Sequence, residues 1–203
     1  IFITHTHVDH IQGLKVFCKK YNPIVYLTEK MHEEINKDIK IDNYKYIEDN
    51  DLIDDLQVNV VKTSHDVSDS NGYLFTHNGK TIVYITDTGY INIKNHSKLY
   101  NKNLYVIESN HDIQLLMNCN RPYHVKQRIL GDKGHLSNKD SSYYISKFIG
   151  DNTECVILAH LSMENNTESL AKATLMETLN KSNKSINKII IAKPDEMTEL
   201  IEV

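Results

Sequence analysis

The chain has 203 residues, of which 40% are hydrophobic and 25% are charged, and its formal net charge is −4. This length predicts a single domain over residues 1–203, and the composition is that of an ordinary globular protein. The charge excludes a protein that is basic overall, although a local basic patch is still compatible with it. The three cysteines have no CxxC spacing, and no apolar run is long enough to cross a bilayer. We therefore expect a cytoplasmic protein without a membrane partner, and we make no prediction of its oligomeric state.

Short β-branched runs predict strands at residues 1–4, 24–27, 58–63, 72–75, 81–86, 104–107, 155–159 and 188–193. Helical patterns follow many of them, at residues 11–21, 28–37, 141–149 and 167–180, with Asp9 and Thr28 as candidate caps of the first two. Asn78-Gly79 predicts a hairpin between two strands. The alternation predicts a mixed α/β (α+β) fold. Because the first run opens at Ile1, we expect strands that would precede it to be missing from this sequence.

Residues that commonly bind metals follow four of these strands. They are His5, His7, Asp9 and His10 in the segment THTHVDH, and then His65, Asp87 and His160. Side chains just beyond the carboxyl ends of strands can converge in one crevice. A lone histidine or aspartate is usually structural, but three imidazoles and a carboxylate at one strand end point to a metal. Imidazole and carboxylate suit zinc and similar ions, and Asp87 is the carboxylate expected to lie between two of them.

The segment THTHVDHIQG, residues 4–13, resembles the HxHxDHxxG signature of the metallo-β-lactamase superfamily. The resemblance extends from Phe2 to about Leu179 and implies an αββα sandwich with two divalent ions, Zn²⁺, Mn²⁺ or Fe²⁺, at one edge. It implies one ion bound by His5, His7 and His65, a second bound by Asp9, His10 and His160, and Asp87 bridging the two.

Three later segments resemble the YycJ/WalJ branch of this superfamily, whose members are regarded as DNA exonucleases. They are ESNHD (residues 108–112), KQRILGDKGHLSN (126–138) and LAHLSMENN (158–166). This resemblance implies a dinuclear phosphodiesterase that acts on DNA, with a metal-bridging hydroxide as the nucleophile. Asp9, Glu108 and His135 are the candidate catalytic residues. We expect His135 to protonate the leaving oxygen and Glu108 to orient it; a purely structural hydrogen bond is the alternative, and His111 is a weaker candidate for the acid.

A basic stretch precedes the GHLSN segment and contains Arg121, Lys126, Arg128 and Lys133. These side chains are candidates for contacts with a nucleic-acid backbone, whereas a solvated helix face is the alternative. Ser137 either contacts phosphate or caps the helix that follows it.

Three other functions are compatible with the same ligands. The first is a ribonuclease similar to the tRNA 3′-processing enzymes, but the chain has no long inserted arm for gripping tRNA. The second is a hydrolase of small thioesters or lactones, which would need neither the basic stretch nor the ESNHD and GHLSN segments. The third is a catalytically silent fragment that still binds metal.

Overall fold

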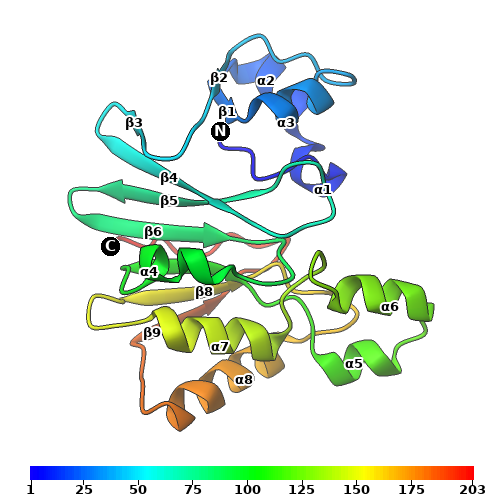
Figure 1. Cartoon of the computed structure of the whole chain (residues 1–203), viewed down its shortest axis with the longest axis vertical. Helices are drawn as coiled ribbons and strands as arrows, with labels where there is room; N and C mark the ends of the chain where they lie inside the picture. The colour runs from blue at the N-terminus through cyan, green and yellow to red at the C-terminus, as the bar shows by residue number, and fades with distance from the viewer.

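The computed structural model describes residues 1–203 as a layered α/β structure (Figure 1). Its strands are β1 (Val25–Leu27), β2 (Tyr44–Tyr46), β3 (Asp51–Ile53), β4 (Leu56–Lys62), β5 (Asn71–His77), β6 (Lys80–Ile85), β7 (Leu104–Glu108), β8 (Cys155–Ala159) and β9 (Lys188–Ile191). Its helices are α1 (Val8–Ile11), α2 (Leu14–Tyr21), α3 (Glu29–Ile35), the 3₁₀ turn η1 (Ile93–Asn95), α4 (His96–Leu99), α5 (Ile113–Asn118), α6 (Tyr123–Leu130), α7 (Asn138–Phe148) and α8 (Glu168–Lys181). None of the helices combines the length and apolarity that crossing a bilayer requires.

The main sheet has seven strands in the order β3-β4-β5-β6-β7-β8-β9. Its first four strands are antiparallel, whereas β6 to β9 are parallel. The predicted hairpin is confirmed, since Asn78 and Gly79 have φ of 48° and 77° and connect β5 to β6. Because parallel strands end at the same edge of a sheet, the residues that follow β6, β7 and β8 are brought together there.

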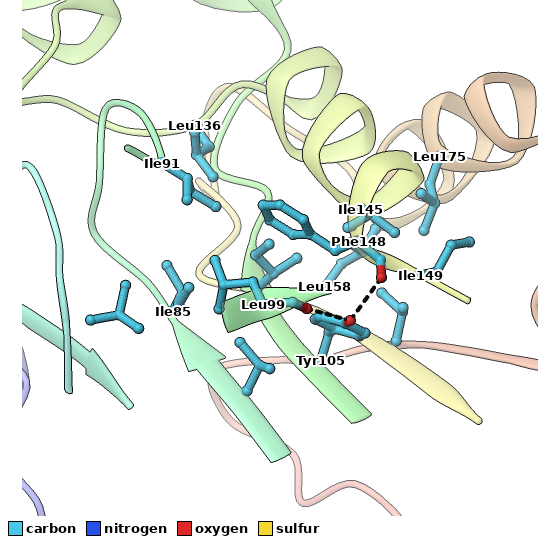
Figure 2. Packing of buried hydrophobic residues seen from close by; sticks show 14 of the residues in the cluster. Ile85, Ile91, Leu99, Tyr105, Leu136, Ile145, Phe148, Ile149, Leu158 and Leu175 are labelled. Carbon is cyan, nitrogen blue, oxygen red and sulfur yellow. Dashed lines mark hydrogen bonds between the residues drawn. The ribbon is translucent and has the colours of Figure 1, made fainter. Parts of the chain in front are cut away.

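The largest core lies between this sheet and the helices α7 and α8 (Figure 2). Its residues include Ile85 and Leu158 from the sheet, and Ile145 and Leu175 from the two helices. Tyr105 is fully buried among them, and its hydroxyl lies 2.7 Å from the carbonyl of Leu99 and 3.0 Å from that of Phe148. The same oxygen accepts a hydrogen bond from the backbone N–H of Lys102 at 2.8 Å. This polar group is therefore satisfied within an apolar layer.

The opposite face of β4 and β5 carries a second layer built on the parallel pair β1-β2. Tyr26 and Ile47 pack here against Val58 and Tyr73. Beyond β1, a third cluster joins this small sheet to α2 and α3. The order is therefore helix, sheet, sheet, helix, which confirms the expected αββα class.

Two expectations near the beginning of the chain are corrected by the structure. Residues 1–4 form only an isolated bridge, between Phe2 and Tyr26, rather than a full strand. This segment pairs with β1 only briefly, because the carbonyl of Thr4 accepts a hydrogen bond from the N–H of Asn71 in β5.

The helix expected at residues 11–21 is divided in two, because Gly13 is the N-cap of α2. Asp9 lies inside the first turn of α1 and caps neither helix. The second expected cap is confirmed, since the Thr28 hydroxyl accepts a hydrogen bond from the N–H of Met31 at the start of α3.

Candidate metal centre

Three imidazoles from two segments meet at the edge of the main sheet. His5 is fully buried and its Nε2 has no hydrogen-bond partner. His65 follows β4, and its Nδ1 can only donate to the carbonyl of Gly134, 3.2 Å away. That bond leaves the lone pair of His65 on Nε2, which lies 3.2 Å from Nδ1 of His7. One nitrogen from each of the three histidines falls within a span of 4.8 Å.

A second set consists of Asp9, His10 and His160, whose donor atoms also lie within 4.8 Å of one another. Asp9 and His10 come from α1, and His160 follows β8. Oδ2 of Asp9 lies 3.5 Å from Nε2 of His10. Residues 150 positions apart in the sequence therefore face the same point.

Asp87 lies between the two sets and is only 2% exposed. Its Oδ1 is 3.7 Å from Nε2 of His65 and 3.5 Å from Nε2 of His160. Its Oδ2 is 3.4 Å from Nε2 of His10 and has no hydrogen-bond partner. This carboxylate can contribute one oxygen to each neighbouring set.

The geometry fits the binding of divalent metal ions. Ligands of zinc lie at about 2.0–2.2 Å, so two ligands of one tetrahedral ion are about 3.3 Å apart. The separations of 3.2 to 3.7 Å around Asp87 and His65 agree with this spacing. Burial and the neighbouring histidines lower the pKa of His5 to about 2, and burial lowers the pKa of His65. Both rings are therefore neutral, which is the form that binds a metal.

Two of these candidate ligands have an unusual backbone. Asp87, two residues after β6, and His160, directly after β8, adopt the left-handed conformation, with φ of 55° and 57°. This region is sparsely populated by residues other than glycine, and such strain is concentrated at functional sites. The sharp turn places each side chain directly over the strand ends.

Glu108, the last residue of β7, is completely buried and accepts four hydrogen bonds. Its Oε1 accepts from Nδ1 of His135 and from Nδ1 of His160, each at 2.8 Å. Its Oε2 accepts from the backbone N–H groups of Thr88 and Leu136, each at 3.1 Å. The predicted pairing of Glu108 with His135 is present, and the same carboxylate also orients the candidate ligand His160.

The charge on Glu108 is set by these contacts. Burial disfavours the carboxylate, but the hydrogen bonds from His135 and His160 outweigh it and lower the pKa of Glu108 to about 2. In return, despite its own burial, the pKa of His160 is raised to about 9 by Glu108 and Asp87, and the pKa of His135 is also raised. An anionic Glu108 therefore holds the Nδ1 proton of both rings and directs both Nε2 atoms outward.

Two glycines let the loops of the site approach closely. A Cβ atom at Gly134 would lie 2.1 Å from the carbonyl oxygen of Ile129, and one at Gly89 would lie 2.3 Å from that of Asp132. At Gly89, the loop that carries Asp87 contacts the loop that leads into His135. Only a residue without a side chain fits at either contact.

A cavity of about 420 Å³ opens beside the metal centre, with the candidate acid His135 in its wall. Three cations of the basic stretch, Arg121, Arg128 and Lys133, also line it. Lys133 is exposed, whereas Arg121 pairs with Glu164 in the structure. These three positions lie beside the candidate metal centre, and their contact with a nucleic-acid backbone stays a prediction.

The structure contradicts two of the expected substrate contacts. Lys126 is 9% exposed, and its ammonium group donates to the carbonyls of Met117 and Cys119 at 2.7 Å each, so it joins α6 to the end of α5. Ser137 is 1% exposed and caps α7, with its hydroxyl accepting from the N–H of Asp140. Both side chains are occupied within the fold and are not free to bind a phosphate.

One residue of the site was missed by the sequence reasoning. Oδ1 of Asp66 lies 3.5 Å from Nε2 of His7 and 3.6 Å from Nε2 of His65, and its Oδ2 accepts a hydrogen bond from Nε of Arg128 at 2.5 Å. Arg128 therefore contacts the metal centre through Asp66. The position of Asp66 directly after His65 was the available signal.

Comparison with known proteins assigns the family. The family model described as "Beta-lactamase superfamily domain" matches residues 1–146. The chain belongs to the beta-lactamase superfamily. Among relatives in this superfamily, it is 35% identical over 184 residues to exodeoxyribonuclease YycJ of Bacillus anthracis, covering 88% of this chain and 70% of that protein. It is 33% identical over 219 aligned positions to exodeoxyribonuclease WalJ of Streptococcus pneumoniae, covering 100% of this chain and 79% of the relative.

Solved structures agree with this assignment. The metallo-beta-lactamase fold protein YhfI of Bacillus subtilis superposes with a TM-score of 0.66 at 18% identity, over 95% of this chain and 74% of that one. Zn²⁺-bound PqqB of Methylobacterium extorquens superposes with a TM-score of 0.67 at 12% identity, over 94% and 69% of the two chains. These likenesses establish the fold. With the His and Asp clusters, the family identifies a metal-dependent hydrolase.

Proposed function

We propose that this member of the beta-lactamase superfamily is a dinuclear phosphodiesterase that degrades DNA from an end. The observation that carries the proposal is the convergence of seven donor side chains beside a cavity lined by cations. The similarity to two relatives named exodeoxyribonucleases supports DNA as the substrate.

The proposed ligands divide into two groups, with His5, His7 and His65 on one ion, Asp9, His10 and His160 on the other, and Asp87 shared. The bound ions would neutralise charge on the phosphodiester and supply a water nucleophile at neutral pH. The protein holds Asp87 and His160 in place through the strained turns, and orients His160 through Glu108.

His135 is the proposed general acid. Its Nδ1 donates to Glu108, so its Nε2 is the nitrogen available to give a proton to the leaving oxygen. Because Glu108 stays anionic, it favours the protonated form of His135 that this step requires. Arg121, Arg128 and Lys133 would attract the phosphate backbone, and binding would weaken as salt rises.

The test is a panel of labelled substrates with Mn²⁺ or Zn²⁺: linear duplex DNA, covalently closed circular DNA, precursor tRNA and a thioester. Release of mononucleotides from linear DNA, with closed circles left intact, supports the proposal. Preference for precursor tRNA or for the thioester would reject it. His135→Ala should retain about two metal ions per chain by elemental analysis and lose about 100-fold or more in turnover. The matched control is His124→Ala, since His124 is an exposed histidine on α6.

A further inference from the structure

Two buried side chains in the wall of the cavity have polar atoms that nothing in the protein satisfies. His111 and Asn165 both line the cavity and are each 1% exposed. Neither ring nitrogen of His111 has a hydrogen-bond partner, and neither has Oδ1 of Asn165. Leaving buried polar groups unpaired is costly, so a folded protein retains them where they bind something else.

The neighbouring Asn166 shows that this part of the fold can satisfy an amide. Its Nδ2 donates to the carbonyls of Ser109 and Asn110, and its Oδ1 accepts from Nδ2 of Asn138. Asn165 is adjacent in the sequence and also buried, yet its Oδ1 is unpaired. The difference between them is that Asn165 lines the cavity.

The segments that carry these two side chains are hydrogen-bonded to each other and to the metal centre, and together they form the floor of the cavity. The N–H of Asp112 donates to the carbonyl of Asn165, and the N–H of Ser162 donates to that of Asn110. Nδ2 of Asn110 donates to the carbonyl of the candidate ligand His160. A molecule held by this floor is therefore placed at a fixed distance from the proposed metals.

The surroundings favour a nucleoside over a phosphate. Leu116, Val125 and Ile129 from α5 and α6 form an apolar wall of the same cavity. His111 itself offers no positive charge to a phosphate, because burial lowers its pKa and keeps the ring neutral, and the cations that line the same cavity, Arg121, Arg128 and Lys133, belong to other segments. A neutral imidazole and an amide beside apolar side chains suit a base and its sugar, and the volume of about 420 Å³ is that of a small-molecule site.

We propose that the cavity binds the terminal nucleoside of the strand being cleaved, through hydrogen bonds from His111 and Asn165 and packing against the apolar wall. The inference rests on the proposed function. It explains why cleavage would be limited to a strand end. A cavity that is closed at its base accepts only one terminal nucleoside and places the adjoining phosphodiester at the proposed metals.

The test uses His111→Leu and Asn165→Leu in the full chain, with Asn180→Leu on the exposed face of α8 as the matched control. Binding of thymidine monophosphate is measured by calorimetry, and kcat/KM is measured for thymidine 5′-(4-nitrophenyl) phosphate and for bis(4-nitrophenyl) phosphate. Each cavity variant should weaken thymidine monophosphate binding about tenfold or more, because the site loses a polar partner of the nucleoside. The ratio of the two kcat/KM values should fall by a similar factor.

Urea unfolding separates this role from a structural one. If His111 or Asn165 stabilises the fold, its replacement by leucine should lower the urea unfolding midpoint. If its unpaired atoms serve to bind the nucleoside, the replacement should leave the midpoint unchanged or raise it. If the wild-type protein binds thymidine monophosphate through both residues but cleaves no DNA, the proposed function is rejected and the cavity assignment is kept. If the wild type cleaves DNA but does not bind thymidine monophosphate, the cavity assignment alone is overturned. The same holds if the variants cleave DNA and bind thymidine monophosphate as tightly as the wild type does.

Discussion

Glu108 offers a quantitative test of how the site is held together. Its carboxylate accepts two hydrogen bonds at each oxygen, and all four donors are fixed by the fold. In Glu108→Gln, the new NH₂ group must face one of these donor pairs. Two donors then lose their acceptor, at about 1–3 kcal/mol each, so the free energy of unfolding should fall by about 2–6 kcal/mol. That loss is large against the stability of about 5–15 kcal/mol of ordinary domains.

The orientation of the amide decides where else the loss appears. If the NH₂ group faces His135 and His160, both rings can accept at Nδ1 only by moving their proton to Nε2, which would remove the lone pair of His160 from the metal centre. Metal affinity should therefore be measured by competition with a chromophoric chelator, alongside urea unfolding of the metal-free protein. The control is Glu154→Gln, whose partly exposed carboxylate pairs with Lys80 and should matter little. A Glu108→Gln protein with wild-type metal affinity and stability within about 0.5 kcal/mol would refute the reasoning.

Three further predictions concern the fold around the site. Tyr105→Phe should lower the free energy of unfolding by about 1–3 kcal/mol. Because burial raises the pKa of Tyr105 to about 12, wild-type stability should fall as pH rises from about 10 to 12, and in urea titrations the variant should lose less, since burial also raises the pKa of other tyrosines such as Tyr73. Gly89→Ala should push the Asp132 loop away, and thermal unfolding together with elemental analysis should show lower stability and less bound metal; unchanged values would contradict the close contact. Lys126→Met should cost about 1.5–3 kcal/mol in urea unfolding but leave the salt dependence of DNA binding unaltered, and a shallower salt slope would restore Lys126 as a phosphate contact.

The donor residues could be located from the sequence because their positions depend on short-range rules. Asp87 and His160 each follow a β-branched run that becomes a strand of the main sheet, and the ends of parallel strands meet at one edge. The pairing of Glu108 with His135 was inferred through resemblance. That Glu108 also serves His160 depends on β7 and β8 being neighbours, which no local pattern reveals.

The errors arose where long-range contacts decide the role of a side chain. Lys126 looks like a surface cation in the sequence, but its partners are backbone carbonyls at the end of α5. The unpaired atoms of His111 and Asn165 likewise cannot be recognised before the whole fold is known. The helix expected from residue 11 is an error of another kind, because its interruption at Gly13 follows from the low intrinsic helix preference of glycine, which is a local signal.

The left-handed turns at Asp87 and His160 tie the chemistry to the parallel centre of the sheet. The two strands that lead into these turns, β6 and β8, pair on either side of β7. A cavity-forming substitution deep in that centre, such as at Ile107, would let both turns relax toward ordinary backbone angles and spread the donors apart. Damage at a side chain that contributes no donor atom would then be observed first as a protein that still folds but binds less metal.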